Sequence, residues 1–191
     1  MAPAFDKTAL RLRMRGLRRR MGAEVPDAAW RAAAALPLPR LPPFRTFAAY
    51  YAQGSEIDPS PLAERLAAHG AAATLPVALS GEGRLQFRRW RIGESLEPDA
   101  VGVPSPPAGE PSLAPELVIA PLLAFDRFGG RLGQGGGHYD RTLANLRATA
   151  PVFVIGLAYA AQEVDEIPME PHDERLDAVL TEAGYREFER D

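Results

Sequence analysis

The stretch that decides the fold is ELVIAPLLAFDRFGGRLGQGGGHYDR, which covers residues 116–141. Its first part, residues 116–121, is a short apolar run that predicts a buried strand. Six of the nine residues 129–137 are glycine, and a helix is expected to follow over residues 138–148. A strand, a glycine-rich loop and a helix in this order indicate one unit of an α/β fold.

The glycine-rich loop has the composition of a phosphate-binding loop. Glycine lacks a Cβ atom, so its backbone can approach an anion closely and can adopt positive φ. The N–H groups can then converge on a phosphate, and the following helix adds the positive end of its dipole. Residues 133–138 lack the final glycine of the dinucleotide-binding pattern, and no Gly-Lys-Ser/Thr follows. A flexible surface loop is the alternative interpretation.

Helices and strands alternate on both sides of this loop. Helices are predicted over residues 6–21, 27–35, 58–70 and 138–148, and strands over residues 45–52, 72–79, 84–92, 116–121, 152–159 and 178–180. This alternation predicts an α/β fold, a single three-layer domain over residues 1–191 with a mostly parallel sheet flanked by helices. Residues 93–115 contain six prolines and are expected to form a long irregular loop, usually a functional or flexible feature.

Composition excludes several classes of protein. Hydrophobic residues make up 46% of the chain, which is typical of a globular protein. No apolar run approaches the roughly 20 residues that a membrane span needs. The absence of cysteine excludes disulfides, thiolate catalysis and Cys-ligated metal sites. We expect a cytoplasmic monomer that binds neither nucleic acid nor membrane.

Positive charge is concentrated at the N-terminus. Residues 1–20 hold seven basic residues and one acidic residue, whereas the whole chain has a net charge of −3. Such a patch implies an anionic partner, either a nucleic acid or a phosphate-bearing ligand. An Arg-rich, acid-poor N-terminus is also typical of an organelle transit peptide.

The predicted N-terminal helix places its basic residues on different faces. Lys7 and Arg11 lie one turn apart and can face one phosphate chain together. Lys7 is the sole lysine in a chain that otherwise uses arginine, which suggests that a compact ammonium group is required there. Arg15 continues the row of Lys7 and Arg11, whereas Arg13, Arg18, Arg19 and Arg20 are expected to form a solvated basic face.

Several motifs resemble the 5-formyltetrahydrofolate cyclo-ligase family. Residues 129–140, GGRLGQGGGHYD, are similar to the family's stretch Gly-x-Arg-Leu-Gly-x-Gly-x-Gly-Tyr-Tyr-Asp, and Phe-Asp precedes them as in the family. Further similarities lie at residues 7–11, 54–58, 85–90, 96–98 and 165–181, and the match is weakest at residues 22–44 and 104–115. The sequence departs from the pattern at His138, where the family has tyrosine, and at Gln134, where some members have arginine.

The resemblance implies an ATP- and Mg²⁺-dependent ligase of one-carbon metabolism. It implies cyclisation of 5-formyltetrahydrofolate to 5,10-methenyltetrahydrofolate through a phosphorylated formyl intermediate, with release of ADP and phosphate. The implied catalytic residues are Lys7 and Arg131. The implied ATP-binding residues are Lys7, Thr8, Ala9, Leu10, Arg11, Arg131, Leu132, Gly133, Gln134, Gly135, Gly136, Gly137, His138 and Tyr139.

The resemblance also implies a folate site and a metal site. The implied folate-binding residues are Tyr51, Glu56, Gln134, Gly135, Gly136, Gly137 and His138, with Glu56 reading the pterin through paired hydrogen bonds. Asp140 and Asp177 are the implied Mg²⁺ ligands, and Asp126, Asp165, Asp173 and Glu174 are alternatives. Two other functions stay open: a sugar-phosphate isomerase or CoA transferase, and a nucleic-acid-binding protein with a basic arm.

Overall fold

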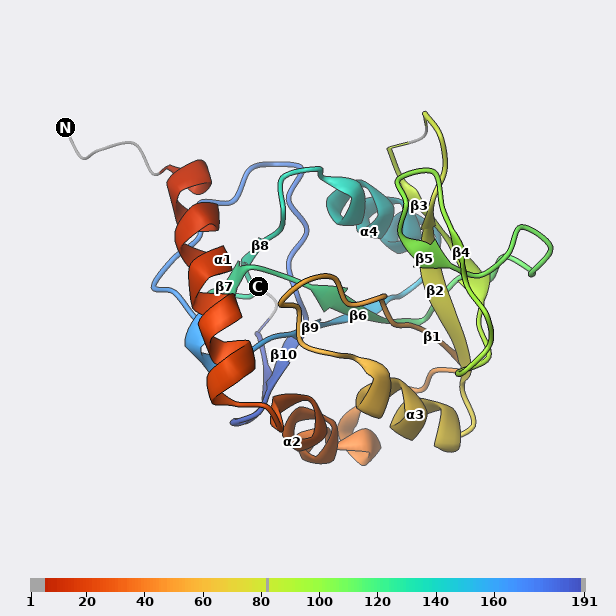
Figure 1. Cartoon of the computed structure of the whole chain (residues 1–191), viewed down its shortest axis with the longest axis horizontal. Coiled ribbons are helices and arrows are strands. Elements are labelled where there is room, and N and C mark those ends of the chain that lie inside the picture. Colours follow the sequence, from red (N-terminus) through yellow and green to blue (C-terminus); the bar gives the residue numbers. More distant parts are fainter. Residues whose placement is uncertain (1–5, 82, 190–191) are drawn as a thin grey trace.

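The computed structural model describes residues 6–81 and 83–189, and its centre is a seven-stranded sheet of order β11-β10-β9-β6-β1-β2-β3 (Figure 1). The bounds are β1 Thr46–Ala48, β2 Ala72–Ala78, β3 Leu85–Arg89, β6 Leu117–Pro121, β9 Phe153–Leu157, β10 Ala178–Thr181 and β11 Gly184–Glu187. All neighbouring pairs from β10 to β2 are parallel, whereas β3 and β11 add antiparallel edges. The predicted α/β fold with a mostly parallel sheet is confirmed, and β11 was not predicted.

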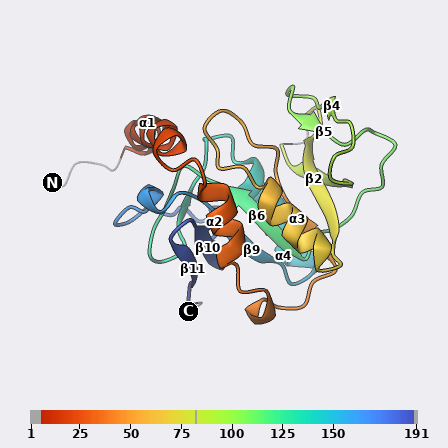
Figure 2. The same ribbon diagram turned by 60° about the horizontal axis from the view of Figure 1, so that its bottom comes forward.

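Helices cover both faces of this sheet. Their bounds are α1 Lys7–Glu24, α2 Ala28–Ala35, α3 Ser60–Ala68 and α4 His138–Thr149, with short 3-10 turns at Leu38–Arg40 and Ala160–Gln162. Figures 1 and 2 show α2 and α3 on one face and α4 on the other, while α1 stands beside the sheet. The core is accordingly divided: α2 and α3 pack in one apolar cluster, and Leu143 of α4 packs in another.

Helix α1 forms as the apolar spacing predicts. The Asp6 carboxylate caps its first turn by accepting hydrogen bonds from the backbone N–H groups of Thr8 and Ala9. Leu10, Met14 and Met21 are buried along one face. This packing holds the rest of the first turn, including Lys7, at a fixed position beside the sheet.

The connections create a crevice between β1 and β6. Helix α3 joins β1 to β2 on one face, whereas α4 joins β6 to β9 on the other. The chain therefore leaves the neighbouring strands β1 and β6 toward opposite sides. In open α/β sheets, ligands bind at such a switch point, outside the carboxyl ends of the strands.

Two segments predicted to be irregular contain small sheets. In the glycine-rich segment, β7 Ala124–Phe125 pairs antiparallel with β8 Arg131–Leu132. The turn between them closes on Asp126, whose Oδ1 atom accepts hydrogen bonds from the N–H groups of Phe128 and Gly130. A Cβ atom on Gly130 would lie 2.5 Å from the Asp126 carboxylate, so this position requires glycine. Within residues 93–115, β4 Glu97–Pro98 pairs with β5 Pro104–Ser105.

No helix in residues 6–81 and 83–189 is both long enough and apolar enough to cross a membrane. The longest of them, α1, carries six arginines and one lysine within its 18 residues.

Candidate active site

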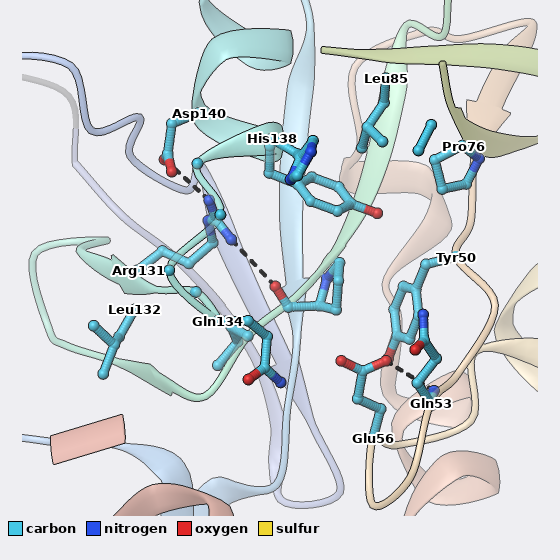
Figure 3. A pocket seen from close by; sticks show the side chains of 18 of the residues that line it. Tyr50, Gln53, Glu56, Pro76, Leu85, Arg131, Leu132, Gln134, His138 and Asp140 are labelled. Atoms are coloured by element: carbon cyan, nitrogen blue, oxygen red, sulfur yellow. Dashed lines mark hydrogen bonds and ion pairs between the residues drawn. The ribbon is translucent and has the colours of Figure 1, made fainter. Parts of the chain in front are cut away.

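A pocket of about 450 Å³ opens at the carboxyl edge of the sheet, in the crevice between the ends of β1 and β6. This volume is within the range of small-molecule sites. Figure 3 shows Arg131 and Asp140 on one side of it and Tyr50 and Glu56 on the other. The predicted site residues that line the pocket are Lys7, Arg11, Tyr51, Glu56, Arg131, Leu132, Gly133, Gln134, Gly135, Gly136, Gly137, His138, Tyr139 and Asp140.

Four predicted site residues lie outside the pocket lining. Thr8 and Ala9 are capped by Asp6 at the start of α1. Leu10 is buried and packs in the apolar cluster with Leu132. The fourth, Asp177, lies beside α4 and β9 and is described below.

Arginine side chains hold the glycine-rich loop by its carbonyl groups. Arg11 Nε donates to the Gly133 oxygen at 3.0 Å, and Arg141 Nη2 donates to the Gly136 oxygen at 2.7 Å. Gly137 is the left-handed N-cap of α4, with φ of 66°. Within the part of the chain that the structure describes, the backbone N–H groups of residues 134–137 donate no hydrogen bond. The loop therefore offers several N–H donors at the start of a helix, the arrangement that binds phosphate.

Lys7 is held at the edge of the pocket by two carboxylates. Its Nζ atom lies 2.9 Å from Glu170 Oε1 and 3.0 Å from Asp173 Oδ2. Burial opposes protonation, but the hydrogen bonds to these two acids outweigh it and raise the pKa of Lys7. Burial likewise works to raise the pKa of Asp173, but the Glu170 backbone N–H and Lys7 hold that pKa below its usual value. The charges of Lys7 and Asp173 thus stabilise one another.

Arg131 is buried under the glycine-rich loop and pairs with Asp140. The distance from Arg131 Nη2 to Asp140 Oδ1 is 2.9 Å, and the same Oδ1 atom accepts a hydrogen bond from the Glu174 backbone N–H at 3.2 Å. The guanidinium carbon lies 5.5 Å from the centre of the Tyr139 ring. Two donors here, Arg131 Nε and the Tyr139 hydroxyl, are buried and have no hydrogen-bond partner among the residues that the structure describes. Buried polar groups normally have hydrogen-bond partners, so these two donors could bind an acceptor atom of a ligand in the pocket.

The structure does not bring Asp177 into the pocket beside Asp140. Asp177 is 4% exposed, and its Oδ2 atom accepts hydrogen bonds from Val154 N at 2.7 Å and Arg147 Nη2 at 3.0 Å. Among the described residues, no group of three or more His, Cys, Asp or Glu residues could hold a metal ion. Mg²⁺ needs only one or two protein carboxylates when phosphate oxygens and water complete its octahedron. Asp140, which lines the pocket, fits that requirement.

Glu56 lies on the opposite side of the pocket in a polar pair with Arg18. Its Oε2 atom accepts a hydrogen bond from the Gln53 N–H at 3.0 Å, and its Oε1 atom lies 3.5 Å from Arg18 Nη1. Burial raises the pKa of Glu56, although Gln53 and Arg18 partly oppose the shift. The expectation that Arg18 is solvated is wrong. It is 5% exposed and donates to the Leu122 carbonyl and the Ser55 hydroxyl.

The two positions that depart from the family pattern both lie at the pocket. His138 begins α4, and Gln134 is exposed at the tip of the glycine-rich loop. Arg15 holds the Gln134 side chain through two hydrogen bonds to Oε1, at 3.1 and 3.0 Å. Tyr51 is 44% exposed at the pocket, so its ring is accessible to a ligand.

Sequence reasoning missed much of the pocket wall. The pocket-lining residues that it missed are Tyr50, Gln53, Pro76, Ala78, Leu85, Asp99, Val101, Val103, Pro121, Leu122, Glu170 and His172, whereas Asp173 was named as an alternative metal ligand. Tyr50, Gln53, Ala78, Pro121 and Leu122 lie at or just after the carboxyl ends of β1, β2 and β6, so the strand order would have pointed to these five. Asp99, Val101 and Val103 come from the proline-rich segment, where the unusual length of the loop was the one signal of a functional role.

Comparison with known proteins agrees with the sequence motifs. The model of the 5-formyltetrahydrofolate cyclo-ligase family matches residues 4–182. The chain is 38% identical to a 5-formyltetrahydrofolate cyclo-ligase of Mycolicibacterium smegmatis over 148 residues, which cover 72% of this chain and 73% of the relative. It is 35% identical to that of Escherichia coli, over 75% of this chain and 81% of the relative.

Solved structures show the same fold. The 5,10-methenyltetrahydrofolate synthetase of Aquifex aeolicus superposes with a TM-score of 0.76 over 97% of this chain and 94% of its own, at 23% identity. That of Mycoplasma pneumoniae superposes with a TM-score of 0.72 over 93% and 99%, also at 23% identity. As the motifs predicted, the chain belongs to the 5-formyltetrahydrofolate cyclo-ligase family and is an enzyme of the ligase class.

Proposed function

We propose that the protein converts 5-formyltetrahydrofolate and ATP into 5,10-methenyltetrahydrofolate, ADP and phosphate. The observation that carries the proposal is the set of N–H donors in residues 134–137, whose neighbouring carbonyls are bound by Arg11 and Arg141. Lys7 and Arg131 add positive charge at the same pocket. Family membership supports the folate as the second substrate.

The chemistry explains why ATP is required. An amide-like formyl oxygen is a poor leaving group. Transfer of the γ-phosphoryl group to this oxygen breaks the bond to ADP and gives an imidoyl phosphate. N10 then attacks the activated carbon, the C–O bond breaks, phosphate departs and the ring is closed. N10 loses its proton in the process.

The residues of the glycine-loop side serve this transfer by alignment and by charge neutralisation. Backbone N–H groups of residues 134–137 would bind phosphate oxygens. Lys7 would exchange Glu170 and Asp173 for the triphosphate, and the buried Arg131 would donate to an oxygen of the transferred group. Asp140 would hold Mg²⁺, which when bound neutralises phosphate charge. Asp177 as a second ligand stays a prediction from the sequence.

The opposite side would receive the folate. The Glu56 carboxylate can accept two N–H groups from the edge of a pterin, and Tyr51 offers an exposed ring for contact. The raised pKa of Glu56 fits a group whose charge is compensated better by a ligand than by the free protein. The monomeric state and the cytoplasmic location stay predictions from the sequence.

The decisive experiment mixes purified protein with 5-formyltetrahydrofolate and Mg-ATP. We expect the absorbance of the methenyl product to rise together with ADP, in equal amounts. Parallel reactions omit the nucleotide or contain EDTA, and neither should form the methenyl product. Full turnover in either would contradict the proposal.

A further inference from the structure

A short turn from the proline-rich segment forms part of the pocket wall. It covers residues 99–103 and connects β4 to β5, and Asp99, Val101 and Val103 line the pocket. Val101 is 65% exposed there, so its side chain is available to a ligand. None of the motifs singled out in the sequence includes these three residues.

The Asp99 side chain builds this turn and attaches it to the sheet. Its Oδ1 atom accepts hydrogen bonds from the backbone N–H groups of Val101 and Val103, both at 2.9 Å. Its Oδ2 atom accepts a hydrogen bond from Ala78 N at 2.8 Å, at the end of β2. Backbone hydrogen bonds from Asp99 N to the Val103 carbonyl and from Ala100 N to the Ala78 carbonyl support the same turn. The carboxylate therefore stabilises both the shape of the turn and its position against the pocket.

The surroundings of the turn favour an apolar ring over a phosphate. Pro76, Ala78 and Leu85 line the pocket from β2 and β3, which pair with each other. Phosphate-binding groups such as Arg131 lie on the other side, whereas Pro76, Leu85, Tyr50 and Glu56 share one side in Figure 3. A flat ring system placed here can meet apolar side chains on its face and the Glu56 carboxylate at its edge.

We propose that Asp99 is a positioning residue for folate recognition, holding Val101 and Val103 against the ring system of the folate. This inference rests on the proposed function, because it names the substrate that the wall contacts. Asp99 acts through the two valines and does not itself touch the reacting atoms. Its effect is therefore expected in the affinity for folate and not in the phosphoryl transfer.

The test compares Asp99→Asn with Asp99→Ala. Asparagine keeps one oxygen that can accept from Val101 and Val103, but it places an NH₂ group opposite the Ala78 N–H. We expect Asp99→Asn to raise the KM for 5-formyltetrahydrofolate about tenfold, the scale of one lost hydrogen bond with an unpaired partner. Asp99→Ala should raise it further. The KM for ATP and kcat should change less than about twofold, because the phosphate-binding side is untouched.

A matched control separates recognition from general stability. Glu116 also accepts backbone N–H groups, those of Arg45 and Thr46, but it precedes β6 at the far edge of the sheet from the pocket. Glu116→Gln should lower the melting temperature and leave both KM values unchanged. Val101→Ala leaves the Asp99 hydrogen bonds intact and should raise the folate KM about threefold, and it decides the question if the Asp99 variants fail to fold.

The outcomes are distinct. If wild-type protein forms no methenyl product, the proposed function fails before the variants are considered. If wild type is active and the ATP KM rises in place of the folate KM, the wall contacts adenine and the inference is overturned. Unchanged KM values in Asp99→Asn and Val101→Ala, or equal rises in both KM values, overturn it as well.

Discussion

The two sides of the pocket are built in different ways. The glycine-loop side is polar, and ionic and hydrogen bonds from Lys7, Arg11 and Arg131 hold its groups in place. The opposite side presents mostly apolar side chains, and its pocket-lining carboxylates include Glu56 and Asp99. The proposed function assigns the phosphates to the polar side, where alignment sets the rate, and the folate to the apolar side, where contacts set the affinity. Substitutions on the two sides should therefore change different kinetic constants.

The largest effect is expected on the glycine-loop side, at Lys7. Lys7→Arg keeps the charge and Lys7→Ala removes it, yet both should lower kcat/KM on the order of a hundredfold, since misalignment of about 1 Å can cost that much. If Lys7 binds the triphosphate as proposed, arginine's planar fork cannot take the place of its compact ammonium without moving the triphosphate. Steady-state kinetics with saturating folate would measure the loss.

The control for Lys7 is Arg13→Ala. Arg13 lies on the same helix but is exposed to solvent. Its replacement should change activity little, because exposed charges contribute little. Wild-type activity in Lys7→Arg would contradict the phosphate role of Lys7. It would also contradict the expectation that substitutions on the two sides of the pocket change different kinetic constants.

The next largest effect is expected on the opposite side, at Glu56. Glu56→Gln replaces one acceptor by a donor that meets the pterin N–H groups, so folate binding should weaken by about 2 kcal/mol, roughly thirtyfold. ATP binding should be nearly unchanged. Calorimetric titration with each ligand measures the dissociation constants of folate and of ATP separately. An unchanged dissociation constant for folate would show that Glu56 does not bind the pterin.

Glu56 also predicts a pH dependence. Burial raises its pKa in the free protein, so it takes up a proton at a higher pH than an ordinary glutamate does. If Glu56 binds the pterin as proposed, the ionised carboxylate is the form that binds, and the affinity for folate should fall as the pH decreases through that raised pKa. Above it, the affinity should be constant. Glu56→Gln should lose this dependence, and a wild-type profile that is equally flat would contradict the assignment.

The same comparison explains how much the sequence could predict. The fold followed from the alternation of apolar runs and helix periodicity, and the glycine-loop side followed from contiguous residues such as Gly133 and Arg131. The opposite wall joins the ends of strands far apart in the chain to a turn in the proline-rich segment. Neither Asp99 nor Arg18 could be placed, because burial of a charged residue depends on partners that only the tertiary structure brings near.

A smaller effect is expected outside the pocket, at Asp177. Asp177→Asn keeps an oxygen for Val154 N but removes the charge that faces Arg147, whose side chain is 23% exposed. The free energy of unfolding should fall by about 1.5 kcal/mol, less than for a fully buried pair. Thermal unfolding would measure this as a decrease of roughly 3–6 °C.

The metal requirement distinguishes Asp177 from Asp140. Asp140→Asn should raise the Mg²⁺ concentration needed for half-maximal activity, because Asp140 lines the pocket. Asp177→Asn should leave that concentration unchanged, because Asp177 does not line the pocket. A large increase for Asp177→Asn would instead support the ligand role that the sequence predicts.

The smallest effect concerns Tyr139, whose buried hydroxyl lacks a partner in the described chain. Burial raises its pKa, so the group stays protonated and remains a donor. Tyr139→Phe should lower kcat/KM about tenfold, the scale of one hydrogen bond to a charged acceptor, yet leave the unfolding free energy equal or higher.

Tyr50→Phe is the matched control, because the Tyr50 hydroxyl donates to the Ile57 carbonyl at 2.6 Å. That variant should be destabilised by about 1 kcal/mol, since it leaves a buried acceptor unpaired. Equal destabilisation of both variants, without loss of activity in Tyr139→Phe, would show that the Tyr139 hydroxyl serves the fold and not a ligand.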